Sequence, residues 1–191
     1  MIDLMPACRR TADVLATVTD EQLSAPTPCA DMRLDQLLAH IGGLALAFTA
    51  AARKDFGPLT DTPPQVGAQA LDGDWRTSYP ARLAALADAY ADPSAWQGMT
   101  RAGGVDFPGE VGGLIALTEV VIHGWDVARA TAQPYDVDAG TMAAVLSHVT
   151  QSAAEDPVEG LFGPAVPVAA DAPTLHRIVG LTGRDPAWRA P

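Results

Sequence analysis

The segment Leu114–Thr131, LIALTEVVIHGWDVARAT, constrains the fold of this chain more than any other. It is apolar almost all the way round, which is typical of a helix buried at the centre of a helical bundle. Glu119 and His123 lie four residues apart in it, so on a helix their side chains project from the same face. A buried ionisable pair needs a compensating partner, and a metal ion would provide one.

The rest of the chain also predicts helices. Apolar residues recur at helical spacing in six segments, namely residues 3–18, 32–53, 74–91, 110–132, 138–155 and, for a shorter helix, 172–181. Residues 56–73 hold three prolines and three glycines, which predicts a long crossover or lid between the second and third helices. Residues 94–109 alternate loosely around Ala102–Gly104, as expected of a short hairpin that caps one end of a bundle.

These elements together indicate an all-α fold, a four-helix bundle with a long crossover and a short capping hairpin. We expect a single domain overall, in which residues 1–155 form the bundle and residues 156–191 a tail whose short helix packs on it. Periodicity does not identify which four of the five long helices make the bundle.

Composition excludes several classes of function. The 191 residues carry 23 acidic and 12 basic side chains, and a net charge of −11 argues against binding to nucleic acid or to an anionic membrane surface. We expect no signal peptide and no membrane-spanning run, hence a cytoplasmic protein. The two cysteines are expected to be reduced thiols. Lys54 is the single lysine beside eleven arginines, a bias that suggests a GC-rich, actinobacterium-like source.

His40 is the candidate for a third metal ligand. It lies beside the apolar stripe of the helix predicted at residues 32–53. Bundle proteins commonly build metal sites from side chains on facing helices, and His40, Glu119 and His123 would form such a tripod. Three protein ligands leave a coordination position open for water or substrate, as in catalytic sites. The donor types suit Zn, Ni or Fe(II), with Zn as the first choice.

Other interpretations of these residues stay open. His40 would be a core histidine with no ligand role if the bundle bound no metal. Asp126 either pairs with Arg129 on the helix surface or orients His123. His40 is expected about eight residues into its helix, roughly 12 Å along the axis from the helix start. Cys29 precedes that start, so we expect it to be a small buried thiol and not a fourth ligand.

Three blocks of sequence resemble a known family. PTPCADMRLDQLLAHIGG, TEVVIHGWDVARATAQP and LTGRDP resemble the DinB-like superfamily, in particular proteins related to the N-terminal domain of mycothiol-dependent maleylpyruvate isomerase. The resemblance implies a DinB/YfiT-like four-helix bundle whose metal ligands are His40, Glu119 and His123. It also implies that a small thiol such as mycothiol binds at the metal as a co-substrate.

The function implied by this resemblance is a thiol-dependent S-transferase or isomerase that acts on an electrophilic small molecule. Its partners would be that thiol and that electrophile, without nucleic acid or membrane, and a homodimer stays open. Maleylpyruvate isomerisation itself is not expected, because the isomerase has a further C-terminal domain and because Met32 stands where relatives often have tryptophan. The alternatives are a non-catalytic metal- and thiol-binding or sensing module, and a partner-binding bundle without metal.

Overall fold

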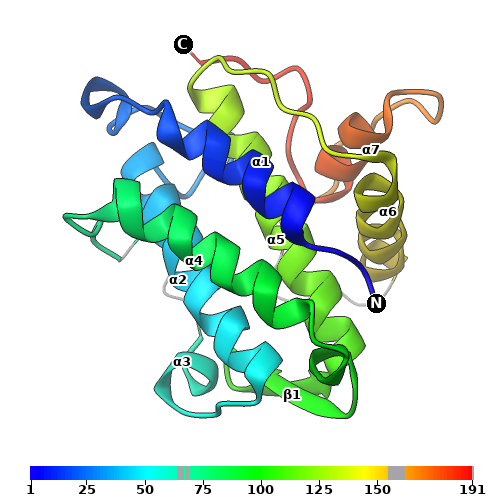
Figure 1. Ribbon diagram of the computed structural model, residues 1–191. Coiled ribbons are helices and arrows are strands. Elements are labelled where there is room, and N and C mark those ends of the chain that lie inside the picture. Colours follow the sequence, from blue (N-terminus) through cyan, green and yellow to red (C-terminus); the bar gives the residue numbers. More distant parts are fainter. Residues whose placement is uncertain (64–66, 68, 155–161, 191) are drawn as a thin grey trace.

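Figure 1 shows the computed structural model, which describes residues 1–63, 67, 69–154 and 162–190. The described residues are mostly helical, and the six predicted helices are confirmed with ends that differ by a few residues. The helices are α1 (Met5–Ala16), α2 (Leu34–Arg53), α3 (Pro58–Asp61), α4 (Trp75–Tyr90), α5 (Gly109–Ala130), α6 (Ala139–Ala154) and α7 (Thr174–Leu181), with a hairpin of β1 (Met99–Ala102) and β2 (Val105–Pro108). The all-α fold class is therefore confirmed.

Helices α1, α2, α4 and α5 make the bundle. Both α1 and α2 pack against α4 and also against α5, so the four helices enclose one apolar core. Helix α6 packs against α5 and α7 packs against α6, which places this pair beside the bundle in Figure 1. As its composition predicts, α5 is the most deeply embedded element, because it contacts helices on both sides.

Two glycines allow neighbouring helices to approach the segments that carry the histidines. A Cβ on Gly42 of α2 would lie 2.6 Å from Cε1 of Tyr79 of α4, far inside van der Waals contact. A Cβ on Gly124 of α5 would lie 2.4 Å from Oγ1 of Thr11 of α1 and 2.5 Å from the hydroxyl of Tyr135. The absence of a side chain at these positions sets how closely the helices pack beside His40 and His123.

The predicted hairpin is confirmed and lies at one end of the bundle. Its strands are antiparallel, with Met99 opposite Pro108 and Ala102 opposite Val105. Gly103 and Gly104 make the two-residue turn with φ of 60° and 79°, values that favour glycine. Thr100 donates a hydrogen bond of 2.5 Å to the Ala51 carbonyl near the end of α2, so the hairpin is fixed to the bundle.

Two expectations reach beyond the described residues. The crossover at residues 56–73 contains the short helix α3, which was not predicted, but residues 64–66 and 68 lie outside the described part. The boundary predicted between residues 155 and 156 also falls outside the described residues, so the division into bundle and tail stays a prediction.

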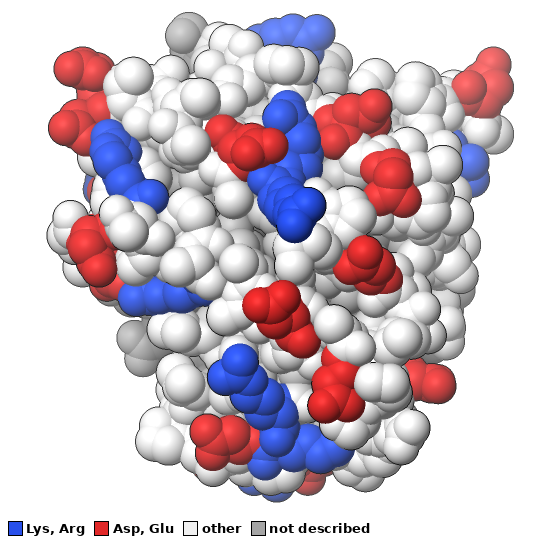
Figure 2. All heavy atoms as spheres, viewed as in Figure 1, with Lys and Arg blue, Asp and Glu red and all other residues white. Residues whose placement is uncertain are grey.

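The structure also bears on two expectations, the absence of a membrane-spanning run and the effect of the net negative charge. Contrary to the expectation of no membrane-spanning run, α2 and α5 are each long and apolar enough to cross a bilayer, with a mean hydropathy of 1.3. However, 67% and 78% of their apolar windows are buried in the bundle, as for core helices. Figure 2 shows acidic and basic side chains interspersed on one face, so the net charge is not gathered into one patch there.

Candidate metal centre

The fold brings together the three side chains that the sequence singles out. His40 comes from α2, and Glu119 and His123 come from successive turns of α5. One ligand atom from each of the three lies within 4.8 Å of the others. Nε2 of His123 is 3.0 Å from Oε2 of Glu119, and the imidazole rings of His40 and His123 meet edge to face with centroids 5.0 Å apart. We call these three residues the tripod.

The tripod is buried, and this changes the protonation of its members. His40 and His123 are 7% and 5% exposed. Burial, together with the charge on His123, lowers the pKa of His40 to about 4. Burial by itself would also lower the pKa of His123, but hydrogen bonds to Asp126 and Glu119 outweigh it and raise the pKa to about 9. The positive charge on His123 in turn holds the pKa of the Glu119 carboxyl below its ordinary value, despite burial.

The donor set fits a divalent ion. Two imidazole nitrogens and a carboxylate oxygen are the ligand types that Zn and similar ions take in bundle cores. Two donors on one tetrahedral Zn ion, each about 2.0–2.1 Å from it, would be about 3.3 Å apart. The 3.0 Å separation of the His123 and Glu119 atoms is close to that value. A cation between them would replace the His123 proton as the group that compensates Glu119.

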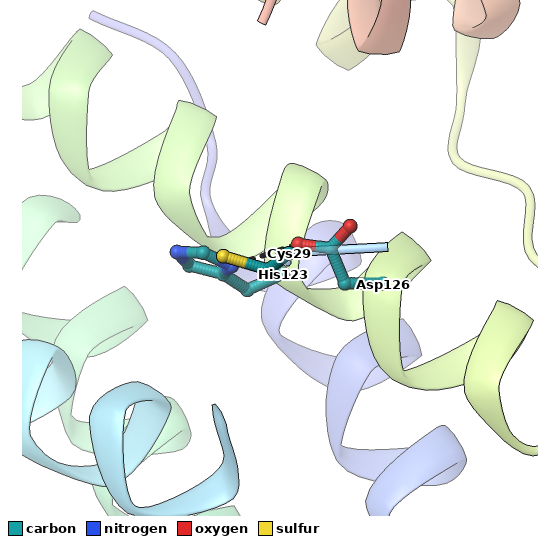
Figure 3. Close-up of side chains that lie close together, drawn as sticks. All are labelled: Cys29, His123 and Asp126. Atoms are coloured by element: carbon teal, nitrogen blue, oxygen red, sulfur yellow. Dashed lines mark hydrogen bonds and ion pairs between the residues drawn. The ribbon is translucent and has the colours of Figure 1, made fainter. Parts of the chain in front are cut away.

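The other nitrogen of His123 faces a second buried carboxylate, as Figure 3 shows. Nδ1 is 3.0 Å from Oδ2 of Asp126, a residue that is fully buried. Arg184, from the segment after α7, pairs with the same carboxylate: Nη2 is 3.1 Å from Oδ2 and Nε is 3.4 Å from Oδ1. Burial would raise the pKa of the Asp126 carboxyl, but the charges of Arg184 and His123 hold it below its ordinary value.

The pairing of Asp126 with Arg129 on the helix surface, one of the two open interpretations, is wrong. Asp126 points into the protein, where Arg184 and His123 take both of its oxygens. Arg129 instead donates to the Trp188 carbonyl and lies over the Trp125 ring, 5.7 Å from its centroid. The other interpretation, in which Asp126 orients His123, agrees with the geometry. The sequence carried no signal for Arg184 beyond its place in the LTGRDP block.

Cys29 lies closer to His123 than the sequence suggested. Its Sγ and ligand atoms of His123 and Asp126 lie within 4.8 Å of one another, and Figure 3 shows the thiol beside the imidazole. The loop before α2 folds back, with Pro26 bridged to Arg33, and Cys29 of this loop lies near His123, although it is not grouped with His40. Burial raises the pKa of the Cys29 thiol to about 11, so it stays protonated at neutral pH. It lies on the Asp126 side of His123 and does not join the set that contains His40 and Glu119.

An apolar hollow borders the tripod at Glu119. It lies between α2, α4 and α5 and has a volume of about 10 Å³, which is room for about one water molecule. The lining side chains are, apart from Glu119, apolar; they are Ile41, Leu44, Ala45, Phe48, Leu86, Ala116 and Val120. On this side, the Glu119 carboxylate is therefore bordered by hydrocarbon side chains.

Comparison with known proteins gives a family and two relatives. The family described as the mycothiol maleylpyruvate isomerase N-terminal domain matches residues 4–128. Two uncharacterized proteins of Mycobacterium tuberculosis, from strains CDC 1551 and ATCC 25618 / H37Rv, are 28% identical over 127 residues, or 66% of this chain. The alignment covers 64% of each relative, so it spans slightly less than two thirds of their length. No solved structure matches the chain significantly.

Proposed function

The chain belongs to the mycothiol maleylpyruvate isomerase N-terminal domain family, and we propose that it binds a divalent metal and uses a small thiol to transform an electrophile. The four-helix fold expected from the motifs agrees with the family match. The reaction would be an S-transfer or an isomerisation, with mycothiol as the co-substrate. The observation that carries the proposal is the convergence of His40, Glu119 and His123 from two helices within 4.8 Å.

Each tripod residue has a distinct task in this proposal. His40, which is neutral at pH 7 because its pKa is lowered to about 4, offers a nitrogen lone pair without first losing a proton. His123 exchanges a proton for the ion, and Glu119 supplies the negative charge that favours a cation over a neutral ligand. When bound, a divalent ion lowers the pKa of a coordinated thiol and so supplies a nucleophile at neutral pH.

The surroundings favour an electrophile with an apolar part. The described residues that line the hollow beside Glu119 are apolar apart from Glu119 itself, and they include no arginine or lysine that would select a second anion. Zn is the first choice of ion, with Ni or Fe(II) as alternatives that the same donors accept.

Metal analysis tests the binding part of the proposal. Purified protein is loaded with Zn, desalted and measured for bound metal, and its thermal unfolding is compared with that of chelator-treated protein. We expect about one ion per chain and a higher melting temperature with Zn, since a ligand that binds only the folded state stabilises it. His123→Ala should lose both effects, whereas His176→Ala, which removes an exposed histidine of α7, should retain both. Equal metal content in wild type and His123→Ala would contradict the proposal.

A thiol assay tests the catalytic part. Mycothiol is mixed with an α,β-unsaturated ketone, and the loss of free thiol is followed with and without the Zn-loaded protein. We expect faster loss that requires both the metal and His123. If the protein binds metal and mycothiol but does not accelerate the loss, with other electrophiles as well, the non-catalytic binding or sensing module replaces the enzyme.

A further inference from the structure

Arg184 lies outside residues 4–128, the part of the chain that matches the family, yet it pairs with Asp126 directly behind His123. Its side chain is 8% exposed, and its guanidinium is shared between the Asp126 carboxylate and the Thr182 carbonyl, which accepts from Nη1 at 2.8 Å. A buried arginine requires such compensation, because an unpaired charge away from water is costly. The pairing joins residues that are 58 positions apart in the sequence.

The end of α7 is built to direct Arg184 inward. The helix stops at Leu181, and Gly183 follows with φ of 84°, a value that favours glycine. The Arg184 amide then donates to the Val179 carbonyl at 2.9 Å, which closes the turn back on the helix. A Cβ on Gly183 would lie 2.8 Å from Cα of Gly163, so this turn also packs closely against the chain before α7.

The shared carboxylate determines which nitrogen of His123 carries hydrogen. An ionised carboxylate only accepts hydrogen bonds, so Nδ1 of His123 must donate to Oδ2 of Asp126. The hydrogen on Nδ1 directs the lone pair of the neutral imidazole to Nε2, on the side of Glu119 and His40. Metal-binding histidines generally have such an acceptor behind them, which fixes the tautomer and the ring orientation.

We propose that Asp126 and Arg184 are positioning residues for the metal centre, and that the segment 182–184 is therefore part of it. Arg184 holds Asp126 by two hydrogen bonds, and Asp126 holds His123 so that Nε2 is aimed at the ion. This inference rests on the proposed function, since it concerns how the tripod binds a metal. In this role Asp126 and Arg184 act through His123 and are not ligands of the ion.

The alternative is that Arg184 and Asp126 form a structural ion pair with no influence on His123. Both roles predict that removing one partner destabilises the protein, so stability alone does not separate them. The metal affinity and the ligand field of a bound ion do separate them, because only the positioning role acts through the imidazole.

The decisive variant is Asp126→Asn, which keeps the size of the side chain. A neutral amide accepts a hydrogen bond from Nδ1 more weakly than a carboxylate does, and an amide that donates its N–H to Nδ1 would move the imidazole hydrogen to Nε2, where the ion binds. We expect the Zn affinity, measured by competition with a chromophoric chelator, to fall about 10- to 100-fold, as for other partners of metal-bound histidines. The visible absorption spectrum of bound Co(II) should also change, because the geometry at His123 changes.

Arg184 is tested by rescue and by a double variant. Arg184→Gln should weaken Zn binding, and Arg184→Lys, which keeps the charge, should recover part of the affinity. The double variant Asp126→Asn/Arg184→Gln should bind no more weakly than Asp126→Asn alone, since Arg184 acts through Asp126. The matched control is Arg82→Gln, which breaks the ion pair between Arg82 and Asp72, neither of which contacts His123 or Asp126 in the ion pairs of the site, and which should leave affinity and spectrum unchanged.

The possible results separate this inference from the proposed function. Wild-type affinity and an unchanged Co(II) spectrum in Asp126→Asn would overturn the positioning role while leaving the tripod intact. Additive losses in the double variant would overturn the action of Arg184 through Asp126. If wild-type protein shows no metal binding that depends on His123, the proposed function fails and this inference fails with it. Should Arg184→Gln not fold, the isosteric Asp126→Asn still decides.

Discussion

The two sides of His123 look alike in distance and differ in charge. At Nε2 the Glu119 carboxylate is 3.0 Å away, and at Nδ1 the Asp126 carboxylate is also 3.0 Å away. Asp126 has a second, permanent cation in Arg184 and is completely buried. Glu119 pairs with His123, keeps 13% of its side chain exposed and borders the apolar hollow.

This difference shows why a cluster of ligand-type residues is not by itself a metal site. Cys29, His123 and Asp126 lie as close together as the tripod does, but Arg184 already neutralises the carboxylate and the thiol keeps its proton. A cation added there would be repelled by the positive charge of the Arg184 guanidinium. On the tripod side the charge of Glu119 is balanced by a proton on His123, which an ion can displace. Four predictions sharpen or break this comparison.

The largest effect should follow from removing Arg184. Arg184→Leu leaves Asp126 buried without its permanent cation, and we expect the free energy of unfolding of apo protein to fall by about 3–5 kcal/mol. Arg82→Leu, which breaks a partly exposed pair, should lower it by only about 0–1 kcal/mol. Urea denaturation at pH 7 measures both. Similar losses in the two variants would mean that Arg184 is not what compensates the buried charge of Asp126.

The affinity of the tripod for Zn should depend on pH. Because the pKa of His123 is raised to about 9, metal must displace a proton from it at neutral pH. We expect the apparent affinity for Zn to rise about tenfold per pH unit from pH 7 and to level off above pH 9. Competition titrations in a non-coordinating buffer measure this slope. A flat profile would show that no proton leaves His123 on binding.

The stability of the apo protein should pass through a maximum at a pH between the pKa values of His40 and His123. The raised pKa of His123 contributes stability that is complete below pH 6.5, its ordinary value, and is lost as the pH rises through about 9. The lowered pKa of His40 acts in the opposite direction, so its contribution is present above pH 6.5 and is lost as the pH falls through about 4. Denaturation of chelator-treated protein from pH 4 to 8, below the range in which the thiols of the unfolded chain ionise, should therefore peak near pH 6.5. Added Zn should remove the alkaline decline, and a decline that persists with Zn would contradict this assignment.

The smallest effect should come from Cys29. Cys29→Ser should change the Zn affinity by less than about twofold, since a protonated thiol is not a metal ligand. Glu119→Gln, on the other side of His123, should weaken binding strongly under the same conditions. Alkylation of Cys29 by iodoacetamide at pH 7 should be slow, because burial raises its pKa to about 11. A large loss of affinity in Cys29→Ser would place the thiol in the metal centre.

Much of the architecture follows from local patterns. The helical repeat of apolar residues predicted every helix of the bundle, because the side chains of one face must be buried together. The short helix α3 was missed, since four residues give no periodicity to detect. The spacing of Glu119 and His123 placed both on one face of α5, because their separation is close to one helical turn. His40 could be nominated from its position beside an apolar stripe.

The partners of Asp126 could not be predicted in this way. Spacing along α5 made Arg129 as good a candidate as any, since residues three apart lie near each other on a helix. The structure selects Arg184 because Asp126 faces the chain that follows α7, and no local pattern reports which distant segment covers a helix face. The closeness of Cys29 to His123 could not be predicted for the same reason, because it depends on how the loop before α2 folds back. That Cys29 is not a fourth ligand of the tripod stays a prediction.

The sequence alone thus determined the helices and the faces they bury, and it placed Glu119 and His123 on one face of a helix, because these features depend on repeats within a few helical turns. His40 joined them as the favoured third ligand through the resemblance to a known family. Only the tertiary structure decided how charge is distributed around His123. That distribution arises from contacts between segments such as α5 and the turn after α7, whose approach depends on the packing of the whole bundle. That packing places the Asp126–Arg184 pair at Nδ1 of His123 and leaves Nε2 facing Glu119.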